Sequence, residues 1–339
     1  MVSSCCYYCH FLGWGLWCLF SIISNLYTKI IYLNHIPKTW KKGITTLIPK
    51  NDSNNNSWRP ITLLNTLYKG LSLIINNHIQ NILTTNHIIP QEQCGFNKTQ
   101  DTSSAIITYL ETIKLSKQNN LPLHAIYIDF KAAFDSVQHW TIPQILKHIQ
   151  INETVINIIS NLISDSQTSF ILQDKTTPEV TLKTGVKQGD PLSPTLFLLY
   201  LLPIQWFLNN NHPKTITNIN HLCYADDMLI LSHSRHTLES LFGQLSIYTY
   251  YTDMNINTQK TMYTFMNDTP QPPFNINILN NENKNIQLNI PLIDKTSNYK
   301  YLGLEINLCL DFQDTIKSYI EKYKEIVLQI LKKNTLDSI

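Results

Sequence analysis

The chain of 339 residues is 43% apolar and 15% charged, which predicts a folded protein with a large core and excludes disordered and fibrous classes. Its length predicts about two or three subdomains. The net charge of +2 does not by itself indicate a nucleic-acid binder, but residues 1–70 carry seven Lys or Arg and one acid, a distribution typical of either a phosphate-binding lobe or a solvated lysine surface.

The seven cysteines are scattered, which argues against a disulfide framework and favours a reducing compartment. We therefore expect an intracellular protein, in nucleus and cytoplasm if functional. Cys5, Cys6 and Cys9 lack the second Cys/His pair that a zinc site needs. The apolar run Cys9–Ile23 is shorter than the roughly 20 residues of a membrane-spanning helix and lacks the basic start of a signal peptide. It predicts a buried helix or the cut edge of a larger protein, with no membrane partner.

The first half of the chain shows mostly helical periodicity around short extended segments. In order, the pattern predicts a helix at 19–40, a strand at 43–49, a polar loop at 51–57, one long or two short helices at 61–84, a buried strand at 121–130, and helices at 131–149 and 152–165.

The second half alternates strands and helices. The pattern predicts a strand pair within 169–182, an apolar core helix at 193–208, a hairpin at 217–232, an amphipathic helix at 237–252, a strand at 261–266, a Pro/Asn-rich loop at 268–286, a strand at 299–306 and a charged helix at 312–334. Long helices beside a small antiparallel sheet predict the α+β class.

Carboxylates stand at the ends of two predicted strands. Asp226 and Asp227 lie at the tip of the hairpin, where Asp is also a common turn former. Asp129 follows the buried strand, either as a helix N-cap or as a functional acid. Together, Asp129 and Asp226 make a ligand set that suits Mg²⁺, with Asp227 as an outer ligand. Two such ions about 4 Å apart would activate a 3′-hydroxyl and stabilise a leaving pyrophosphate.

Two further features permit a ligand-binding reading and an ordinary one. Phe134 lies five residues after Asp129, where its ring would sit beneath a bound sugar or pack in the core. In Gly185–Pro194 two glycines permit close backbone approach to a ligand, and Ser193 can cap the apolar helix that follows. The segment is therefore a ligand loop or a plain capped turn.

Three segments now carry a resemblance: Tyr-Ala-Asp-Asp at 224–227, "DFKAAFDSV" at 129–137 and "GVKQGDPLSPTLF" at 185–197. They are similar to the motifs of reverse transcriptases of the non-LTR (LINE-like) retrotransposon type. Further matches follow in the family's order: "IPKTWKKGITTLIPK" (36–50), "WRPITLLNTLYKG" (58–70), "QCGFNK" (93–98), "MNINTQKT" (254–261) and "YKYLGL" (299–304).

The resemblance implies a right-hand polymerase fold with fingers, palm and thumb, built on a small antiparallel palm sheet. It implies an N-terminal helical extension at 1–35, fingers at 36–120, a palm with a fingers insertion at 121–305, and a truncated thumb at 306–339. We expect no endonuclease domain, RNase H-like domain or Cys/His knuckle in this chain.

Roles for individual residues follow from the resemblance. Asp129, Asp226, Asp227 and the backbone carbonyl of Phe130 would hold two Mg²⁺ ions, with Mn²⁺ as an alternative. Lys260 matches a late palm lysine near the pyrophosphate, a possible proton donor.

The nucleotide-binding roles fall on another set of residues. Lys50 and Arg59 match fingers residues that clamp the triphosphate, and Arg59 is one of only two arginines in the chain. Phe134 resembles the steric gate that excludes a ribose 2′-hydroxyl. Gln188 and Gly189 would lie against the incoming nucleotide and the template.

The function expected is RNA-directed DNA polymerase, with an RNA template, a DNA primer and dNTPs as partners. Asn97, Thr99 and Gln100 depart from the Arg and Gly-Arg of the family. This departure keeps open an alternative, a catalytically silent, decayed or domesticated RNA-binding fragment of the same fold. A group II intron maturase is a weaker alternative.

Overall fold

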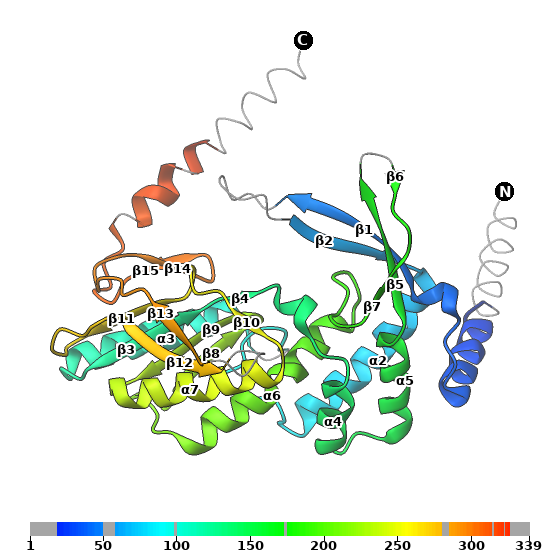
Figure 1. Ribbon diagram of the computed structural model, residues 1–339, viewed down its shortest axis with the longest axis horizontal. Coiled ribbons are helices and arrows are strands. Elements are labelled where there is room, and N and C mark those ends of the chain that lie inside the picture. Colours follow the sequence, from blue (N-terminus) through cyan, green and yellow to red (C-terminus); the bar gives the residue numbers. More distant parts are fainter. Residues whose placement is uncertain are drawn as a thin grey trace, which may run out of the picture. The chain divides into compact units, whose positions relative to one another are not determined.

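A computed structural model describes residues 19–49, 58–97, 100–172, 175–279, 285–313, 315–321 and 323–325. The chain divides into two compact units, and each is made of two separate segments (Figure 1). Unit 1 is Met1–Ile88 with Phe134–Pro203, and unit 2 is Ile89–Ala133 with Ile204–Ile339. Lys50, the cysteines Cys5, Cys6 and Cys9, and the predicted loop at 51–57 lie outside the described residues. The fingers, palm and thumb ranges stay a prediction.

Unit 1 combines one sheet with several helices (Figure 1). After a helical segment at 19–33, its elements are η1 (Lys38–Lys41), β1 (Lys42–Pro49), β2 (Trp58–Leu64), α2 (Thr66–Thr85), η2 (Ala133–Ser136, which begins at the last residue of unit 2), α4 (Thr141–His148), α5 (Glu153–Ile163), β5 (Ser166–Leu172), β6 (Lys175–Thr176), β7 (Val180–Leu182) and the first part of α6 (Ser193–Asn211). The sheet order is β2-β1-β5-β6, and β7 also pairs with β5.

Unit 2 is built on a second, antiparallel sheet. Its elements are α3 (Thr102–Gln118), β3 (Leu123–Ile128), β4 (Phe130–Lys131), the last part of α6, β8 (His221–Tyr224), β9 (Asp227–Ser232), α7 (Arg235–Tyr251), β10 (Asn255–Ile256), β11 (Met262–Met266), β12 (Phe274–Leu279), β13 (Asn285–Ile290), β14 (Tyr299–Tyr301) and β15 (Leu304–Ile306). Residues 315–321 and 323–325 are helical.

The antiparallel sheet has the order β11-β3-β9-β8, so β3 lies in its interior. Every residue of β3 is buried, as expected for an apolar strand covered on both faces. Tyr109 and Ile113 of α3 lie in the same core cluster as Leu229 and Leu231 of β9. The predicted hairpin, buried strand and apolar helix α6 are therefore confirmed.

The structure corrects four of the predicted elements. Residues 61–64 belong to strand β2, so the first helix of that region begins at Thr66, where Asn65 caps it by accepting from two backbone N–H groups. Residues 131–140 contain a 3-10 turn, and the helix begins only at Thr141. The predicted loop at 268–286 contains β12, which pairs with β13. The predicted strand at 299–306 is a tight hairpin, β14–β15.

No helix in the described part of the chain combines the length and apolar character that crossing a membrane requires.

Candidate active site

In unit 2, two strand ends bring acidic residues to one end of the antiparallel sheet. β3 and β9 pair with Ile128 opposite Met228, so Asp129 and Asp227, the next residues along the ladder, come level with each other. β8 and β9 form the hairpin in which Tyr224 pairs with Asp227. Asp226 therefore occupies the two-residue turn beside the end of β3.

The hairpin turn is tight and closely packed. Ala225 has φ of 55° while Asp226 does not have positive φ, a combination typical of a type II′ turn. The segment Glu92–Cys94 pairs alongside β8, because Cys94 N–H donates to the Cys223 carbonyl (2.8 Å) and Cys223 N–H donates to the Glu92 carbonyl (2.9 Å). A Cβ on Gly95 would lie 2.3 Å from the backbone nitrogen of Ala225. Only glycine permits this close approach to the turn.

The three acids interact electrostatically. The pKa of Asp227 is raised to about 6, first because the surrounding protein partly desolvates its carboxyl and then because Asp226 and Asp129 are negatively charged. The positive charge of Lys260 acts in the opposite direction. Tyr299 lies near the same acids, and desolvation followed by the charges of Asp227 and Asp129 raises its pKa to about 12. The structure thus brings Asp129, Asp226, Asp227 and Lys260 together.

One turn, Asn257–Thr261, holds Asp129 at three points. Asn257 donates its backbone N–H to the Asp129 carbonyl (2.8 Å) and its side-chain Nδ2 to Asp129 Oδ2 (2.8 Å). The Asp129 N–H donates to Thr261 Oγ1 (3.3 Å). Lys260 and Thr261 both donate their N–H groups back to the Asn257 carbonyl, which closes the turn.

Asn257 and Tyr299 were missing from the predicted site. Both lie inside segments that carry the resemblance, "MNINTQKT" and "YKYLGL". The sequence of these segments does not show that the Asn257 amide contacts the carboxylate of Asp129. Phe130 is buried in β4, where it pairs with Ile256 of β10. Its carbonyl as a metal ligand stays a prediction.

The donor set suits a hard divalent cation, since carboxylate oxygens are the ligands that Mg²⁺ and Mn²⁺ prefer. The mutual repulsion that raises the pKa of Asp227 is what a bound cation would relieve. Across the described residues, however, no group of three or more His, Cys, Asp or Glu side chains is arranged as a ready metal site. The carboxylates interact through their charges without forming a coordination cluster.

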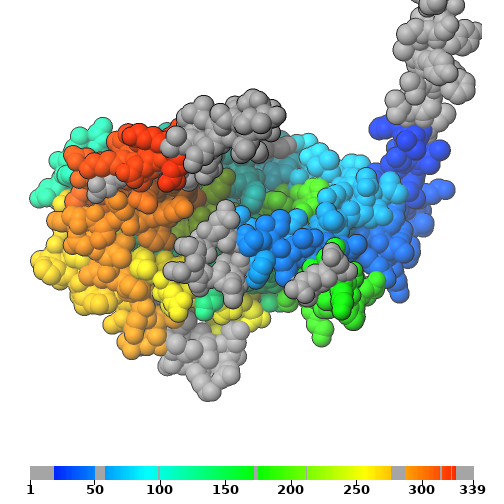
Figure 2. All heavy atoms as spheres, turned by 90° about the horizontal axis from the view of Figure 1, so that it is seen from above, coloured from blue at the N-terminus to red at the C-terminus, as the bar shows by residue number. Residues whose placement is uncertain are grey.

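The predicted nucleotide-binding residues all fall within the range of unit 1, and Lys50 alone among them lies outside the described residues. Arg59 lies in β2 opposite Ile48, is exposed, and makes no ion pair with any described residue. The loop that carries Gln188 packs on the same strand, because Thr62 N–H donates to the Gln188 carbonyl (2.7 Å). Gly189 has φ of 119°, and a Cβ there would lie 2.4 Å from the Thr62 carbonyl oxygen. In Figure 2, atoms in the blue shades of β1 and β2 lie at the surface on the face that the view shows.

Phe134 is joined to this loop from the other side. Val186 N–H donates to the Phe134 carbonyl (2.9 Å), and Gly185 N–H donates to the Val137 carbonyl (2.8 Å). The Phe134 ring is half-buried and stacks on Phe197 of α6, with ring centroids 4.7 Å apart. The ring therefore packs on a core side chain while part of it stays exposed, and its role as a steric gate stays a prediction. Gln188 and Gly189 lie in this loop, and Arg59 and Phe134 lie in the two segments that hydrogen-bond to it, β2 and η2.

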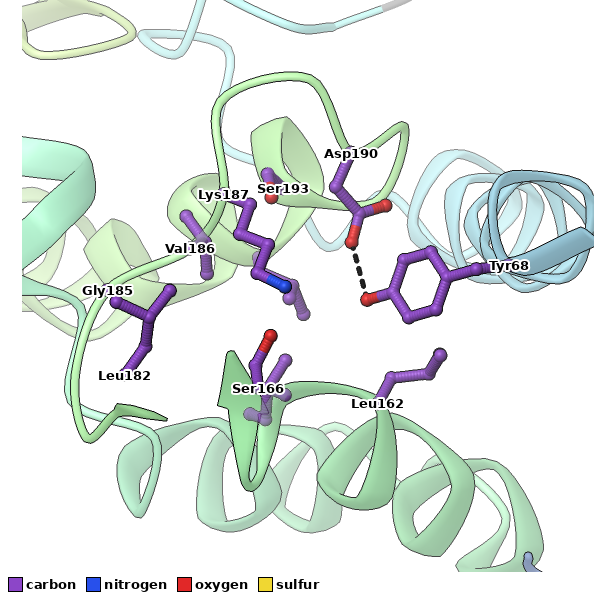
Figure 3. Close-up of a pocket in the computed structure, with 11 residues that line it drawn as sticks. Tyr68, Leu162, Ser166, Leu182, Gly185, Val186, Lys187, Asp190 and Ser193 are labelled. Atoms are coloured by element: carbon purple, nitrogen blue, oxygen red, sulfur yellow. Dashed lines mark hydrogen bonds between the residues drawn. The ribbon is translucent and has the colours of Figure 1, made fainter. Parts of the chain in front are cut away.

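A buried polar network fixes the base of this loop. Asp190 accepts from Tyr68 Oη (2.9 Å) and from Ser72 Oγ, and Lys187 Nζ donates to the backbone carbonyls of Lys41 (2.6 Å) and Gln167 (2.9 Å). Figure 3 shows Tyr68 and Asp190 pointing toward each other beside Lys187. The cavity there measures about 10 Å³, room for about one water molecule. Burial lowers the pKa of Lys187 to about 8, although Asp190 opposes the shift.

Comparison with known proteins gives the family. Residues 48–306 match the family described as reverse transcriptase (RNA-dependent DNA polymerase). The chain is 28% identical over 235 residues to a retrovirus-related Pol polyprotein from the type-1 retrotransposable element R2 of Popillia japonica, covering 67% of this chain and 32% of that protein. It is 23% identical over 323 residues to the RNA-directed DNA polymerase from mobile element jockey of Drosophila melanogaster, covering 91% and 33%. The chain spans about a third of the length of these relatives.

Solved structures agree on the fold. The chain superimposes on apo telomerase from Candida tropicalis, truncated from its C-terminal domain, with a TM-score of 0.55 at 15% identity, covering 82% of this chain and 55% of that one. A telomerase from the same organism in complex with a fragment of telomeric RNA gives a TM-score of 0.56 at 16% identity, covering 88% and 48%. The architecture is the right-hand polymerase fold.

Proposed function

The chain belongs to the reverse transcriptase (RNA-dependent DNA polymerase) family, and we propose that it is the polymerase domain of a non-LTR retroelement, which copies an RNA template by adding deoxynucleotides to a DNA primer. The observation that carries this proposal is the meeting of Asp129, Asp226 and Asp227 at one end of the unit 2 sheet. These acids stand in segments that resemble the family's motifs.

In the proposed reaction, the primer 3′-oxygen attacks the α-phosphorus of a dNTP, the new P–O bond forms, and pyrophosphate leaves. Two divalent cations, Mg²⁺ or Mn²⁺, would lower the pKa of the 3′-hydroxyl and neutralise charge on the leaving group when bound. Asp129, Asp226, Asp227 and the Phe130 carbonyl would hold them. Lys260 would donate a proton to the departing pyrophosphate, which suits an exposed ammonium beside these acids.

Residues of unit 1 would bind the nucleotide. The guanidinium of Arg59 is a planar, multidentate donor suited to a triphosphate, and Lys50 would add a second positive charge. Gln188 and Gly189 would contact the base pair through a loop whose backbone is already fixed to β2. Phe134 would select deoxyribose by steric exclusion, with its ring held by Phe197.

Primer extension on poly(rA)/oligo(dT) with Mg²⁺ and dTTP tests this function. We expect extension by the unaltered chain and a loss of at least about 100-fold in Asp129→Asn and Asp226→Asn, because each removes a negative charge needed for two cations. Asp294→Asn is the matched control, since Asp294 lies on the surface and bonds only its local turn. Equal extension by both active-site variants and the unaltered chain would contradict the assignment.

Two observations favour a second function, a catalytically silent RNA-binding fragment. The acids are not arranged as a ready metal site in the described residues, and Asn97 stands where the family often has Arg. RNA retention in a filter-binding assay, together with no extension in Mg²⁺ or Mn²⁺, would support this reading over the polymerase.

A further inference from the structure

We infer that Asn257 is a positioning residue for the polymerase reaction, which sets the orientation of the Asp129 carboxylate through the turn Asn257–Thr261. This inference rests on the proposed function, since it concerns how one of the proposed metal-binding acids is presented. The relevant contacts all lie within unit 2.

The geometry restricts Asp129 along both its backbone and its side chain. Asn257 donates two hydrogen bonds to Asp129, each 2.8 Å long. Its backbone N–H donates to the Asp129 carbonyl, and its side-chain Nδ2 donates to Oδ2. Thr261, which is fully buried, accepts the Asp129 N–H. With backbone and one carboxylate oxygen fixed, the remaining freedom of the side chain is small. Oδ1 accepts no hydrogen bond from the described residues, so it is the oxygen left for a cation.

The same turn also controls a second charged group. Lys260 is held by its N–H bond to the Asn257 carbonyl (3.1 Å), and Tyr299 Oη donates to the Lys260 carbonyl (3.3 Å). Asn257 therefore couples the acid that would bind a cation to the lysine that would face pyrophosphate. Side chains that orient a ligand in this way typically change metal affinity 10- to 100-fold when they are removed.

The test compares two substitutions that a purely structural role would rank differently. Asn257→Asp keeps the size and the backbone bond but replaces the donor with a second carboxylate that repels Asp129. Asn257→Ala removes the side-chain contact without adding charge. If Asn257 only shaped the turn, the Asp variant would behave like the unaltered chain. If it orients Asp129, the Asp variant would be at least as impaired as the Ala variant.

Two readouts are measured on the full chain. Mn²⁺ binding, followed by the electron paramagnetic resonance signal of free Mn²⁺ without nucleotide, should weaken about tenfold or more in Asn257→Ala, which removes the donor without adding a carboxylate. In primer extension, the Mg²⁺ concentration for half-maximal rate should rise by a similar factor, while the KM for dTTP at saturating Mg²⁺ stays within about twofold. Thr261→Ser should retain normal behaviour and Thr261→Val should not, which provides an independent pair if an Asn257 variant fails to fold.

Asn119→Ala is the control, because the Asn119 side chain bonds only a helix-end carbonyl on the surface of unit 2. Unchanged Mn²⁺ affinity and Mg²⁺ requirement in Asn257→Ala would overturn the inference even if the unaltered chain polymerises. If the unaltered chain binds Mn²⁺ but extends no primer, the proposed function fails, and weaker Mn²⁺ binding in Asn257→Ala still supports the orienting role. Absence of Mn²⁺ binding by the unaltered chain would overturn both.

Discussion

At the scale of single residues, the site is defined by side chains whose neighbours restrict them. Asp129 is restricted by Asn257 and Thr261, and the ring of Phe134 by Phe197. The sequence motifs identified the acids because their chemistry is fixed by residue type. They did not identify Asn257, since an amide has many ordinary uses and its contact with Asp129 spans 128 positions of the chain.

Replacing Phe134 by Val should relax sugar selection. The smaller side chain would remove the surface that is proposed to exclude a 2′-hydroxyl, and would also lose the ring contact with Phe197. We expect the ratio of rUTP to dTTP incorporation, measured as kcat/KM in primer extension, to rise at least about tenfold. Phe207→Val, a change at an exposed ring in unit 2, is the control. Unaltered sugar selection in Phe134→Val would refute the gate.

At the scale of elements, the sequence pattern predicted those strands and turns whose formation depends on residues close together in the chain. β3 was predicted from an unbroken apolar run, and the β8–β9 hairpin from two apolar runs around a tight turn. Residues 61–64, the last four of β2, are predicted as helix because such a short apolar run does not distinguish a strand from a helix. The hairpin β12–β13 was missed although "FNINIL" alternates apolar and polar residues, because its Pro/Asn-rich surroundings favoured a loop.

Pairings between distant segments could not be read from periodicity. β1 lies parallel to β5, more than a hundred positions later, and the segment Glu92–Cys94 lies alongside β8. Gly95 follows that segment and packs on the turn that carries Asp226. The resemblance marked "QCGFNK" as a motif, but its contact with the hairpin emerged only from the structure.

Replacing Gly95 by Ala should therefore displace the turn that carries Asp226. The added methyl group would meet backbone atoms of Tyr224 and Ala225, which cannot rotate away, so the turn must shift. Because displacements of about 1 Å can reduce rates about 100-fold, we expect extension activity to fall by that order while the protein stays folded. Gly243→Ala in α7 is the matched control, since a Cβ there has open space and should stabilise the helix slightly. Normal activity in Gly95→Ala would contradict this account of the turn.

At the scale of the whole molecule, a buried histidine should make the folded chain less stable in acid. His221 is fully buried, and its Nδ1 bonds Asn220 Oδ1 (2.7 Å). Burial lowers its pKa from 6.5 to about 4, although Glu92 opposes the shift. Burial alone would raise the pKa of Glu92, but the hydrogen bonds from Asn209 and Lys214 leave it lowered, so Glu92 is ionised while His221 is neutral.

The sign follows from proton uptake. Between pH 6.5 and about 4 the unfolded chain binds a proton at His221 that the folded chain excludes, so stability falls as pH falls. The limiting slope is about 1.4 kcal/mol per pH unit. We expect the stability lost between pH 7.5 and pH 5.0, measured by urea unfolding, to be roughly 2 kcal/mol larger in the unaltered chain than in His221→Gln, because Asp227 and the other titrating groups are common to both proteins. Equal losses in both proteins would assign the acid sensitivity to other groups.

Each unit combines an early and a late segment of the polypeptide, and this arrangement bears on biosynthesis. A nascent chain leaves the ribosome N-terminus first, so unit 1 waits for Pro203, while the apolar strand β3 waits for β9 and β11 to be translated. At about 5–20 residues per second, β3 would remain uncovered for several seconds. Efficient production in a foreign host should accordingly depend on chaperones that shield that strand until its partners emerge.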